Sequence, residues 1–564
     1  MGTTRSDTDE PVAGTACRPG EQVRRPLLLA ALLAGVVVLG GRSAAWAERE
    51  ASPLSDWHLW METDEHAAIA ASARIVAGNW LDVPAFRPWF SWQARFGTPE
   101  EWDAVVPRNV FYQGPGYPYL LAAANATGFG QVAVARLSQL LLGTAASAVL
   151  AAACVALLLR SGRPAGLAVA AGVLAGVLHG TFAPLVFLDG FLYRDGPVAH
   201  LSAILLAVPL LVSRAPRARE GVLFGLLAGF GALLKQTILP LGLVAGAVLV
   251  SRAEGRRGRT RAAAGFAAGL LVALAPLVAR NVAVGAPPLA FDTRPLVGLP
   301  WANAKGADGS VDAAPLLMDV LKEARGSTLR AGILTLGTWR DDPAGFVHLL
   351  GRKLGSAFNG AEVADNASFF FFRDRLPWLA RMPLFTWLIG AGAAGLLLAR
   401  RRRLFRGGEG LLVAVAALVP LGACLMVSTT TRYRSGVSAP LALGTALFAL
   451  FVFEAFRERR PLRLLPWAGL AAVLTIVALL PAPVRAWPWR WSDTIVAATL
   501  AEARVSPEAG AAEVLRYLEE NRGDPDRVRG LVAMNHWLAG RREHTRVEPS
   551  AVAPPSRRFS AAIR

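Results

Sequence analysis

Long apolar segments, separated by short arginine-rich ones, dominate this amino-acid sequence. Most of them are long enough to cross a bilayer as a helix, which needs about 20 residues. We place them at residues 26–47, 131–159, 165–187, 197–213, 220–234, 237–250, 263–284, 383–399, 410–428, 437–456 and 464–482. The chain is 54% hydrophobic and 18% charged, whereas soluble domains carry about 25% charged residues. The sequence therefore predicts an all-α polytopic membrane protein with about eleven transmembrane helices.

The first apolar segment follows Arg24 and Arg25 and could be mistaken for a secretory signal peptide. No convincing cleavage site follows it, and ten further segments need a starting orientation. We therefore expect an uncleaved first transmembrane helix.

The arginine-rich segments predict the orientation of the chain. Nineteen arginines lie in five short loops that would share one side of the membrane, at 160–163, 214–219, 252–261, 400–406 and 457–463. Basic residues favour the cytoplasmic side, so we expect the N-terminus inside and the C-terminal tail outside. Only four of the 59 basic residues are lysines, which is typical of a GC-rich genome and favours a bacterial cytoplasmic (inner) membrane. The net charge of +18 comes largely from these topology-determining basic residues, so it does not indicate a nucleic-acid partner.

This topology divides the chain into three parts. They are a cytoplasmic tail (1–25), a membrane domain (26–482) with outside loops 48–117 and 285–382, and an outside C-terminal segment (483–564). Helices are predicted near residues 65–80, 507–521 and 527–541, and disorder over 547–564. Tryptophans in the first loop favour a position on the bilayer surface. The four phenylalanines at 369–372 fit either a surface-lying amphipathic segment or packing on the spans, and both readings stay open.

Common motifs of soluble enzymes are absent from the sequence. It has no phosphate-binding P-loop, no His-Glu-x-x-His and no Cys-x-x-Cys, which argues against an ATP-driven pump and an intramembrane zinc protease. Its three cysteines are far apart, so neither a disulfide framework nor a zinc site is indicated.

Two acidic groups lie where the spans meet the outside. Asp64 and Glu65 begin the short helix predicted in the first outside loop, where acids also serve as ordinary N-terminal caps. Asp189, Arg194 and Asp195 lie in a turn between two spans, which could simply be solvated. Ionisable groups close to lipid are costly and often functional, so both groups are candidate sites.

Two basic groups lie on the same side. Lys235 separates two closely spaced segments, and its side chain could merely extend to the interface. Arg432, Tyr433 and Arg434 precede the tenth segment, on the side that the topology leaves poor in arginine. Arginine forks match phosphate oxygens, so this pair is a candidate phosphate-binding group.

Taken in order, these motifs resemble a known family. They are Thr63-Asp64-Glu65 with Arg74 and Gly78-Asn79-Trp80, then Phe111 to Leu120 (FYQGPGYPYL), the Arg194-Asp195 turn, and Arg432-Tyr433-Arg434 with Pro440. The order and sidedness over residues 26–482 resemble the C-type glycosyltransferase superfamily, in the branch of protein O-mannosyltransferases and lipid A aminoarabinose transferases. The resemblance implies a membrane enzyme that transfers a sugar from a polyprenyl-phosphate carrier to a lipid, glycan or protein acceptor outside the cytoplasm.

The resemblance also implies roles for individual residues. The catalytic acid maps to Asp64, with Glu65 beside it, and the second acid to Asp195 rather than Asp189. Residues expected to contact substrate are Tyr117, Arg194, Lys235, Arg432, Tyr433 and Arg434. Thr63, where relatives often have proline, and the long 81–110 insert depart from the pattern and leave the acceptor class open.

The chemistry suits these residue types. A positioned carboxylate can take the proton of the attacking hydroxyl or amine, and fixed cations can stabilise the departing phosphate. A single displacement would invert the anomeric centre. We expect no required cofactor and no metal ligands, although Asp64 and Asp195 could alternatively hold a divalent cation.

Two other functions remain as alternatives. A transporter or flippase of a lipid-linked glycan would share the outside arginines, but transporters usually carry internal repeats and bind near the bilayer midplane. A non-catalytic scaffold that presents residues 483–564 would leave the acidic and basic motifs unexplained.

Overall fold

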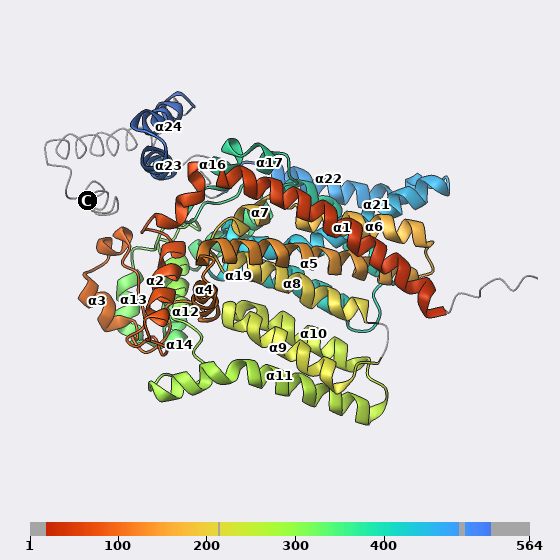
Figure 1. The fold of residues 1–564 in the computed structure, drawn as a ribbon, viewed down its shortest axis with the longest axis horizontal. Coiled ribbons are helices and arrows are strands. Elements are labelled where there is room, and N and C mark those ends of the chain that lie inside the picture. The colour runs from red at the N-terminus through yellow and green to blue at the C-terminus, as the bar shows by residue number, and fades with distance from the viewer. Residues whose placement is uncertain (1–18, 213–214, 484–490, 521–564) are drawn as a thin grey trace, which may run out of the picture.

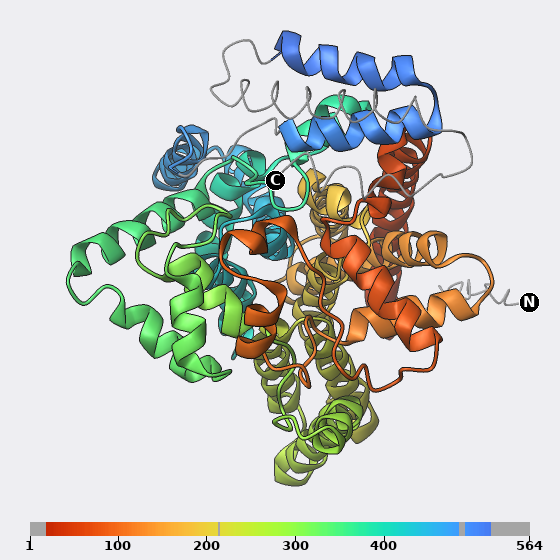
Figure 2. The same ribbon diagram turned by 90° about the vertical axis from the view of Figure 1, so that its left-hand side faces the viewer.

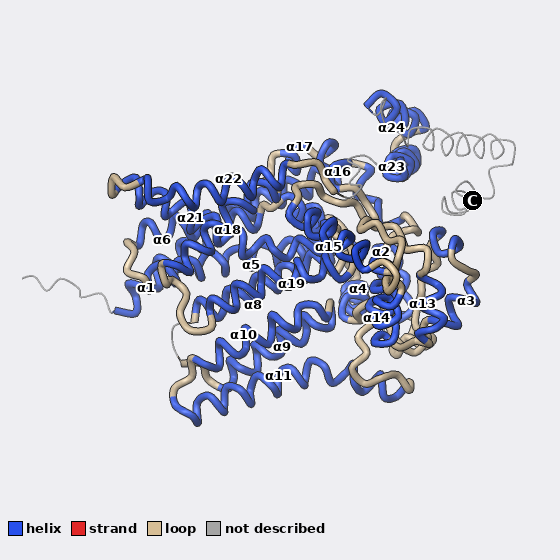
Figure 3. The backbone as a smooth tube through the Cα atoms, turned by 180° about the vertical axis from the view of Figure 1, so that it is seen from behind, coloured by secondary structure: helices blue, strands red, loops and turns tan. Residues whose placement is uncertain are grey.

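The computed structural model describes residues 19–212, 215–483 and 491–520. Throughout these residues the regular structure is helical, with no strand (Figure 3). Long helices run side by side in one bundle, and shorter helices gather at one end of it (Figure 1). The predicted all-α class is confirmed.

The bundle contains the helices that coincide with the predicted apolar segments. They are α1 (Pro19–Glu50), α5 (Gln131–Arg160), α6 (Ala165–Gly180), α7 (Ala183–Asp189), α8 (Asp195–Leu211), α9 (Ala218–Leu234), α10 (Leu239–Ser251), α11 (Gly255–Ala283), α18 (Phe385–Arg401), α19 (Glu409–Met426), α21 (Ser438–Arg457) and α22 (Leu465–Leu479). Within the described residues, seven helical stretches are long and apolar enough to cross a membrane, and the bent pair α6–α7 would make eight. The chain is thus a helical membrane protein, and the number eleven stays a prediction.

Glycines allow the bundle helices to approach closely. Gly225 of α9 and Gly269 of α11 each face backbone of the other helix so tightly that a Cβ would collide with it. Gly395 of α18 and Gly444 of α21 form a second contact of this kind. Small residues at helix contacts are the usual means of packing spans in a bilayer.

The arginine-rich loops meet at one end of the bundle. Arg160 and Arg252 both pair with Glu409, while Arg163 and Arg402 both pair with Glu454. These ion pairs join three of the five arginine-rich segments, 160–163, 252–261 and 400–406, at a common end, as the topology predicts. Which side of a membrane that end faces stays a prediction.

The shorter helices cover the opposite end (Figure 2). They are η1 (Pro53–Leu59), α2 (Asp64–Val76), η2 (Ser91–Arg95), α3 (Pro99–Val105), α4 (Gly116–Ala126), η3 (Gln236–Ile238), α12 (Arg294–Asn303), α13 (Leu317–Ala324), α14 (Thr328–Gly337), α15 (Pro343–Phe358), α16 (Phe369–Arg375), α17 (Pro377–Ala380), α20 (Thr431–Arg434), η4 (Ser435–Val437), α23 (Trp491–Arg504) and α24 (Pro507–Glu520). Only η5 (Pro461–Leu464) lies at the arginine-rich end. The 81–110 insert packs through Trp102 and Val105 against Leu317 and Leu321 of α13.

Of the two interpretations of the phenylalanine segment 369–372, the structure supports packing inside the protein. Phe369, Phe371 and Phe372 are fully buried and lie in one cluster with Trp57 and Phe187. The tryptophans of loop 48–117 differ in exposure: Trp57 and Trp102 are buried, whereas Trp80 is 66% exposed.

The described part of the C-terminal segment, helices α23 and α24, packs on this same end. Helix α24 agrees with the helix predicted near 507–521, while α23 was not predicted. Val496 and Leu500 of α23 join the Trp57 cluster, and Arg504 donates to the carbonyl oxygen of Glu50 at 2.8 Å. The helix expected near 527–541 and the disorder over 547–564 lie outside the described residues.

Candidate functional site

The first residue of α2 places a carboxylate at the centre of this end of the molecule. Thr63 caps the helix, its hydroxyl accepting from the backbone N–H of His66 at 3.2 Å. Asp64 therefore lies in the first helical turn, where the helix dipole favours an anion. Gly78 adopts φ +98° just beyond the helix, a left-handed conformation that glycine reaches without steric cost. The chain then turns away, which ends the helix after Val76.

Arg432 joins three carboxylates that come from distant parts of the chain. Its Nη1 lies 2.6 Å from Oδ2 of Asp64 and 2.9 Å from Oδ2 of Asp365. Its Nε donates to Oδ2 of Asp195 at 2.9 Å. The side chain is largely buried, so these charge-assisted hydrogen bonds are only weakly screened by water.

The other oxygen of Asp64 is also engaged. Oδ1 accepts from Nη2 of Arg294 at 2.7 Å and from Nε2 of Gln113 at 2.8 Å. Burial opposes ionisation of Asp64, but the charges of Arg294 and Arg432 outweigh it and hold the pKa of Asp64 well below its ordinary value. Asp64 is thus a fixed anion, held by two guanidinium groups.

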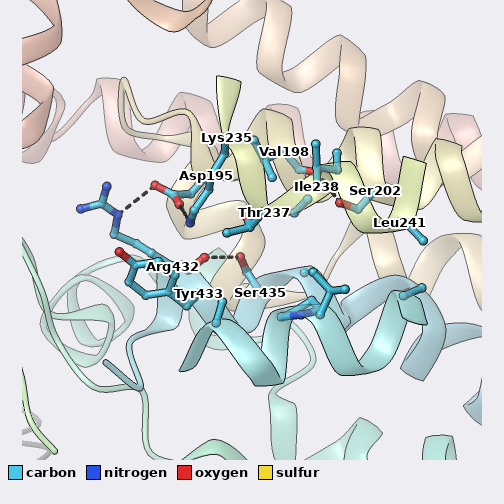
Figure 4. A pocket seen from close by; sticks show the side chains of 16 residues that line it. Asp195, Val198, Ser202, Lys235, Thr237, Ile238, Leu241, Arg432, Tyr433 and Ser435 are labelled. Atoms are coloured by element: carbon cyan, nitrogen blue, oxygen red, sulfur yellow. Dashed lines mark hydrogen bonds and ion pairs between the residues drawn. The ribbon is translucent and has the colours of Figure 1, made fainter. Parts of the chain in front are cut away.

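Lys235 completes the charged cluster on the Asp195 side (Figure 4). Its Nζ donates to Oδ1 of Asp195 at 2.6 Å and lies 4.1 Å from the ring centre of Tyr433. Lys235 occupies the break between α9 and η3, where its backbone is extended. Asp195 is therefore held between one lysine and one arginine.

A pocket of about 460 Å³ opens beside this cluster. Asp195, Lys235, Arg432 and Tyr433 lie at one end of its lining, and the rest comes mainly from apolar residues of α8, η3, α10 and α19 (Figure 4). These are Val198, Ala199, Ile238, Leu241, Ala416, Val419, Pro420 and Ala423. The pocket thus combines a charged end with an apolar wall formed by membrane helices.

The remaining predicted site residues point elsewhere. Glu65 accepts from the backbone N–H of Leu192 at 2.9 Å, so it links α2 to the α7–α8 turn. The hydroxyl of Tyr117 donates to Gln139 at 3.0 Å in the bundle core. Arg434 is buried against Glu362, with their charged atoms 2.6 Å apart.

The two acids of the α7–α8 turn have separate surroundings. Asp189 pairs with Arg42, and Nε2 of His200 lies 2.9 Å from it, inside the bundle. Arg194 lies near the cluster, with Nη1 3.4 Å from Oδ2 of Asp292. Asp195, rather than Asp189, is thus the acid that shares Arg432 with Asp64.

Three residues of the cluster were not predicted from the sequence. Gln113 lies within the Phe111–Leu120 motif, and that motif was the signal that could have identified it. Arg294 and Asp365 lie in the long second outside loop, in no recognisable motif. They reach the cluster through the packing of α12 and of the segment before α16.

A metal ion is a poor fit for these residues as they are placed. The three aspartates converge on a cation already, the guanidinium of Arg432. In the described part of the chain, no three His, Cys, Asp or Glu side chains are grouped so that they could hold a metal.

Comparisons with known proteins give only distant matches. No family model and no curated protein sequence matches the chain. It is similar in structure to the Archaeoglobus fulgidus oligosaccharyltransferase. The complex of that protein with Zn and sulfate is 17% identical over 72% of this chain, with a TM-score of 0.34. Its form tethered to an acceptor peptide is 15% identical over 87%, with a TM-score of 0.37. The apo form is 16% identical over 80%, with a TM-score of 0.34.

The chain is shorter than those proteins. It covers 48% of the Zn and sulfate complex, 58% of the peptide-tethered form and 59% of the apo form.

Proposed function

We propose that this chain is a membrane glycosyltransferase that moves a sugar from a polyprenyl-phosphate donor to an acceptor outside the cytoplasm. One observation carries the proposal: Arg432 joins Asp64 and Asp195 at the charged end of a pocket whose wall is apolar. A lipid phosphate needs fixed cations for its head and an apolar path for its chain. Arg432 and Lys235 offer the first, and the lining from α8, α10 and α19 offers the second.

The proposed reaction is a single displacement. The acceptor's hydroxyl or amine attacks the anomeric carbon, a new bond forms there, and the bond from that carbon to the phosphate oxygen breaks. The phosphate leaves with the electron pair, and its growing negative charge is stabilised by Arg432 and Lys235. Asp64 takes the acceptor's proton as general base, and the anomeric centre inverts.

Donor binding would prepare the base. Both oxygens of Asp64 are occupied before substrate arrives, one by Arg432 and one by Arg294 and Gln113. A lipid phosphate at Arg432 competes for its guanidinium, which frees one oxygen of Asp64 and raises its proton affinity. The other predicted residues would act less directly: Glu65 would position α2, and Arg194, Tyr433, Tyr117 and Arg434 would shape the surrounding walls.

The proposed domain bounds, location and acceptor class are those expected from the sequence. Residues 26–482 would form the transferase domain in a bacterial inner membrane, with the Asp64 end outside and the C-terminal segment 483–564 on that same side. The acceptor would be a lipid, a glycan or a protein. Because the carboxylates already surround a guanidinium, we expect transfer without a divalent cation, so added EDTA should leave the rate unchanged.

Transfer of radiolabelled sugar from a panel of polyprenyl-phosphate donors tests the proposal. Membranes carrying the wild type should transfer label, and Asp64→Asn, expressed to the same level, should be about 10²–10⁴-fold slower. Asp103→Asn is the matched control, since the partners of Asp103 among the described residues are Arg87 and Arg108, both in the 81–110 insert. Equal rates for wild type and Asp64→Asn would refute Asp64 as the base. If no donor is consumed, the enzyme proposal fails and translocation of a lipid-linked glycan becomes the function to assay.

A further inference from the structure

A second group of buried basic side chains lies away from the Asp64 cluster, near the C-terminal end of α1. It lines a cavity of about 520 Å³ that shares no lining residue with the pocket at Asp195. Three arginines line it, Arg42 and Arg49 from α1 and Arg136 from α5. The remaining wall is mostly apolar, with Ala45, Trp46, Leu140, Val186, Phe187, Gly190, Phe372, Leu376 and Leu379, and it also contains the carboxylate of Asp189.

Two of the three arginines have carboxylate partners. Arg42 pairs with Asp189, and its Nε donates to the carbonyl oxygen of Gly180 at 2.7 Å. Arg136 Nη1 lies 2.7 Å from Oε1 of Glu50, and its Nε donates to a carbonyl oxygen at 3.0 Å. Their charges are therefore balanced within the protein.

Arg49 has no such partner. It is 3% exposed, and within the described residues no carboxylate oxygen lies within 4.0 Å of it, although Glu65 and Glu50 act on it from farther away. Its Nε and Nη2 are buried without a hydrogen-bond partner, as is Nη2 of Arg42. Its guanidinium carbon lies 4.2 Å from the ring centre of Phe191, and a cation–π contact of this kind compensates only part of the lost hydration.

A buried charge without a counterion is costly, and so are buried donors without acceptors. Both costs disappear if an anion with several acceptor oxygens enters the cavity. A phosphate group matches the guanidinium fork, and its oxygens would accept from the buried donors of Arg49 and Arg42 that have no other acceptor. The apolar wall, in turn, suits hydrocarbon next to that phosphate.

Along α1, which contributes Arg42 and Arg49, exposed apolar side chains face outward from the bundle. These are Leu28, Leu29, Leu32, Leu33, Val36, Val37 and Leu39. A lipid whose headgroup entered the cavity would have the apolar surface of α1 available for its chains.

We propose that this cavity binds the phosphate headgroup of an anionic membrane lipid, with Arg49 as its main ligand and Nη2 of Arg42 as a second donor. The site is separate from the proposed donor site and does not depend on transferase activity.

Native mass spectrometry of the purified full chain, with phosphatidylglycerol added, tests the proposal. The wild type should bind one phosphatidylglycerol saturably, and at least tenfold more tightly than zwitterionic phosphatidylcholine. Arg49→Gln should lose that preference. Arg381→Gln should keep it, because Arg381 is an exposed arginine near the same end that lines no part of the cavity.

A second variant covers the case in which Arg49→Gln fails to fold. Ala45→Leu narrows the cavity without altering its charge and should also weaken phosphatidylglycerol binding. Equal binding by wild type, Arg49→Gln and Ala45→Leu would overturn the proposal. So would equal affinity for the two lipids, or complete displacement of the lipid by equimolar inorganic phosphate.

Discussion

Arg432 lies between Asp64 and Asp195, with Nη1 2.6 Å from one carboxylate and Nε 2.9 Å from the other. The three residues come from α2, the start of α8 and the short helix α20. One guanidinium of α20 therefore joins loop 48–117, which contains Asp64, to the start of α8 in the helix bundle. In the proposed enzyme it also orders the base and receives the donor's phosphate.

Removing that guanidinium should damage both structure and activity. Arg432→Gln leaves Asp64, Asp195 and Asp365 facing one another, so we expect a loss of about 3–5 kcal/mol in stability and of about 10²–10³ in transfer rate. Arg432→Lys keeps the positive charge but lacks the forked guanidinium, so its stability and transfer rate should lie between those of the wild type and Arg432→Gln. Thermal unfolding in detergent and the radiolabel assay measure the two effects. Full activity of Arg432→Gln would exclude Arg432 from the reaction.

The two acids of the α7–α8 turn should behave differently. Asp195→Asn weakens the pairs with Arg432 and Lys235, so transfer should fall strongly while the bundle still folds. Asp189→Asn weakens the buried pair with Arg42, so the melting temperature should fall more than the activity of the protein that remains folded. Measuring both quantities for both variants checks the prediction. Similar profiles for the two variants would show that the turn acts as a unit.

The pH dependence of stability should report the ion pairs of Asp64. Its pKa is lowered on folding, so these pairs stabilise the protein above the unfolded value of about 3.9 and are lost as the pH falls below it. The difference in melting temperature between wild type and Asp64→Asn should be constant from about pH 7 to pH 5 and should shrink below pH 4. A difference that grows on acidification would contradict this sign.

Gly114 should prove intolerant of a side chain. A Cβ there would collide with the carbonyl oxygen of Leu234 and come within 2.9 Å of Nη1 of Arg194. Gly114→Ala must therefore shift the loop that brings Gln113 to Asp64, and displacements of about 1 Å can cost 10²-fold in rate. We expect a transfer rate reduced tenfold or more. Gly40→Ala on α1, where a Cβ meets nothing within 4 Å, should leave it unchanged.

Lys353 should make the stability of the protein depend on pH in the alkaline range as well. It is fully buried in α15 and donates to Asn303 Oδ1 at 2.7 Å and to the carbonyl oxygens of Leu425 and Val427. Burial lowers its pKa to about 7, against about 10.4 in the unfolded chain. Between these values the unfolded state binds more protons, so this residue's contribution to stability rises with pH.

Lys353→Met should remove that rise. The melting temperature of the wild type relative to Lys353→Met is expected to increase from pH 7 to pH 10. A relative stability that stays flat over this range would mean that Lys353 keeps its proton in the folded protein.

The candidate site was foreseeable only in part. Asp64 could be found because a threonine cap and two acids mark the start of a helix in the sequence. Arg432 stood out as an arginine on the side that carries few of them. Arg294 and Asp365 have no local signal of this kind. Arg434 follows closely after Arg432 in the sequence, but it forms an ion pair with Glu362 and does not join the cluster.

The sequence by itself determined the helical membrane class, the positions of the apolar segments and the common end of the arginine-rich loops. These follow from hydropathy and capping, which act over one helix or a few neighbouring residues. Only the tertiary structure showed that Arg432 joins Asp195 and Asp365 to Asp64, and that Arg49 is buried with no carboxylate oxygen within 4.0 Å among the described residues. Ion pairs form between side chains a few ångströms apart in space, and that proximity depends on how distant helices pack.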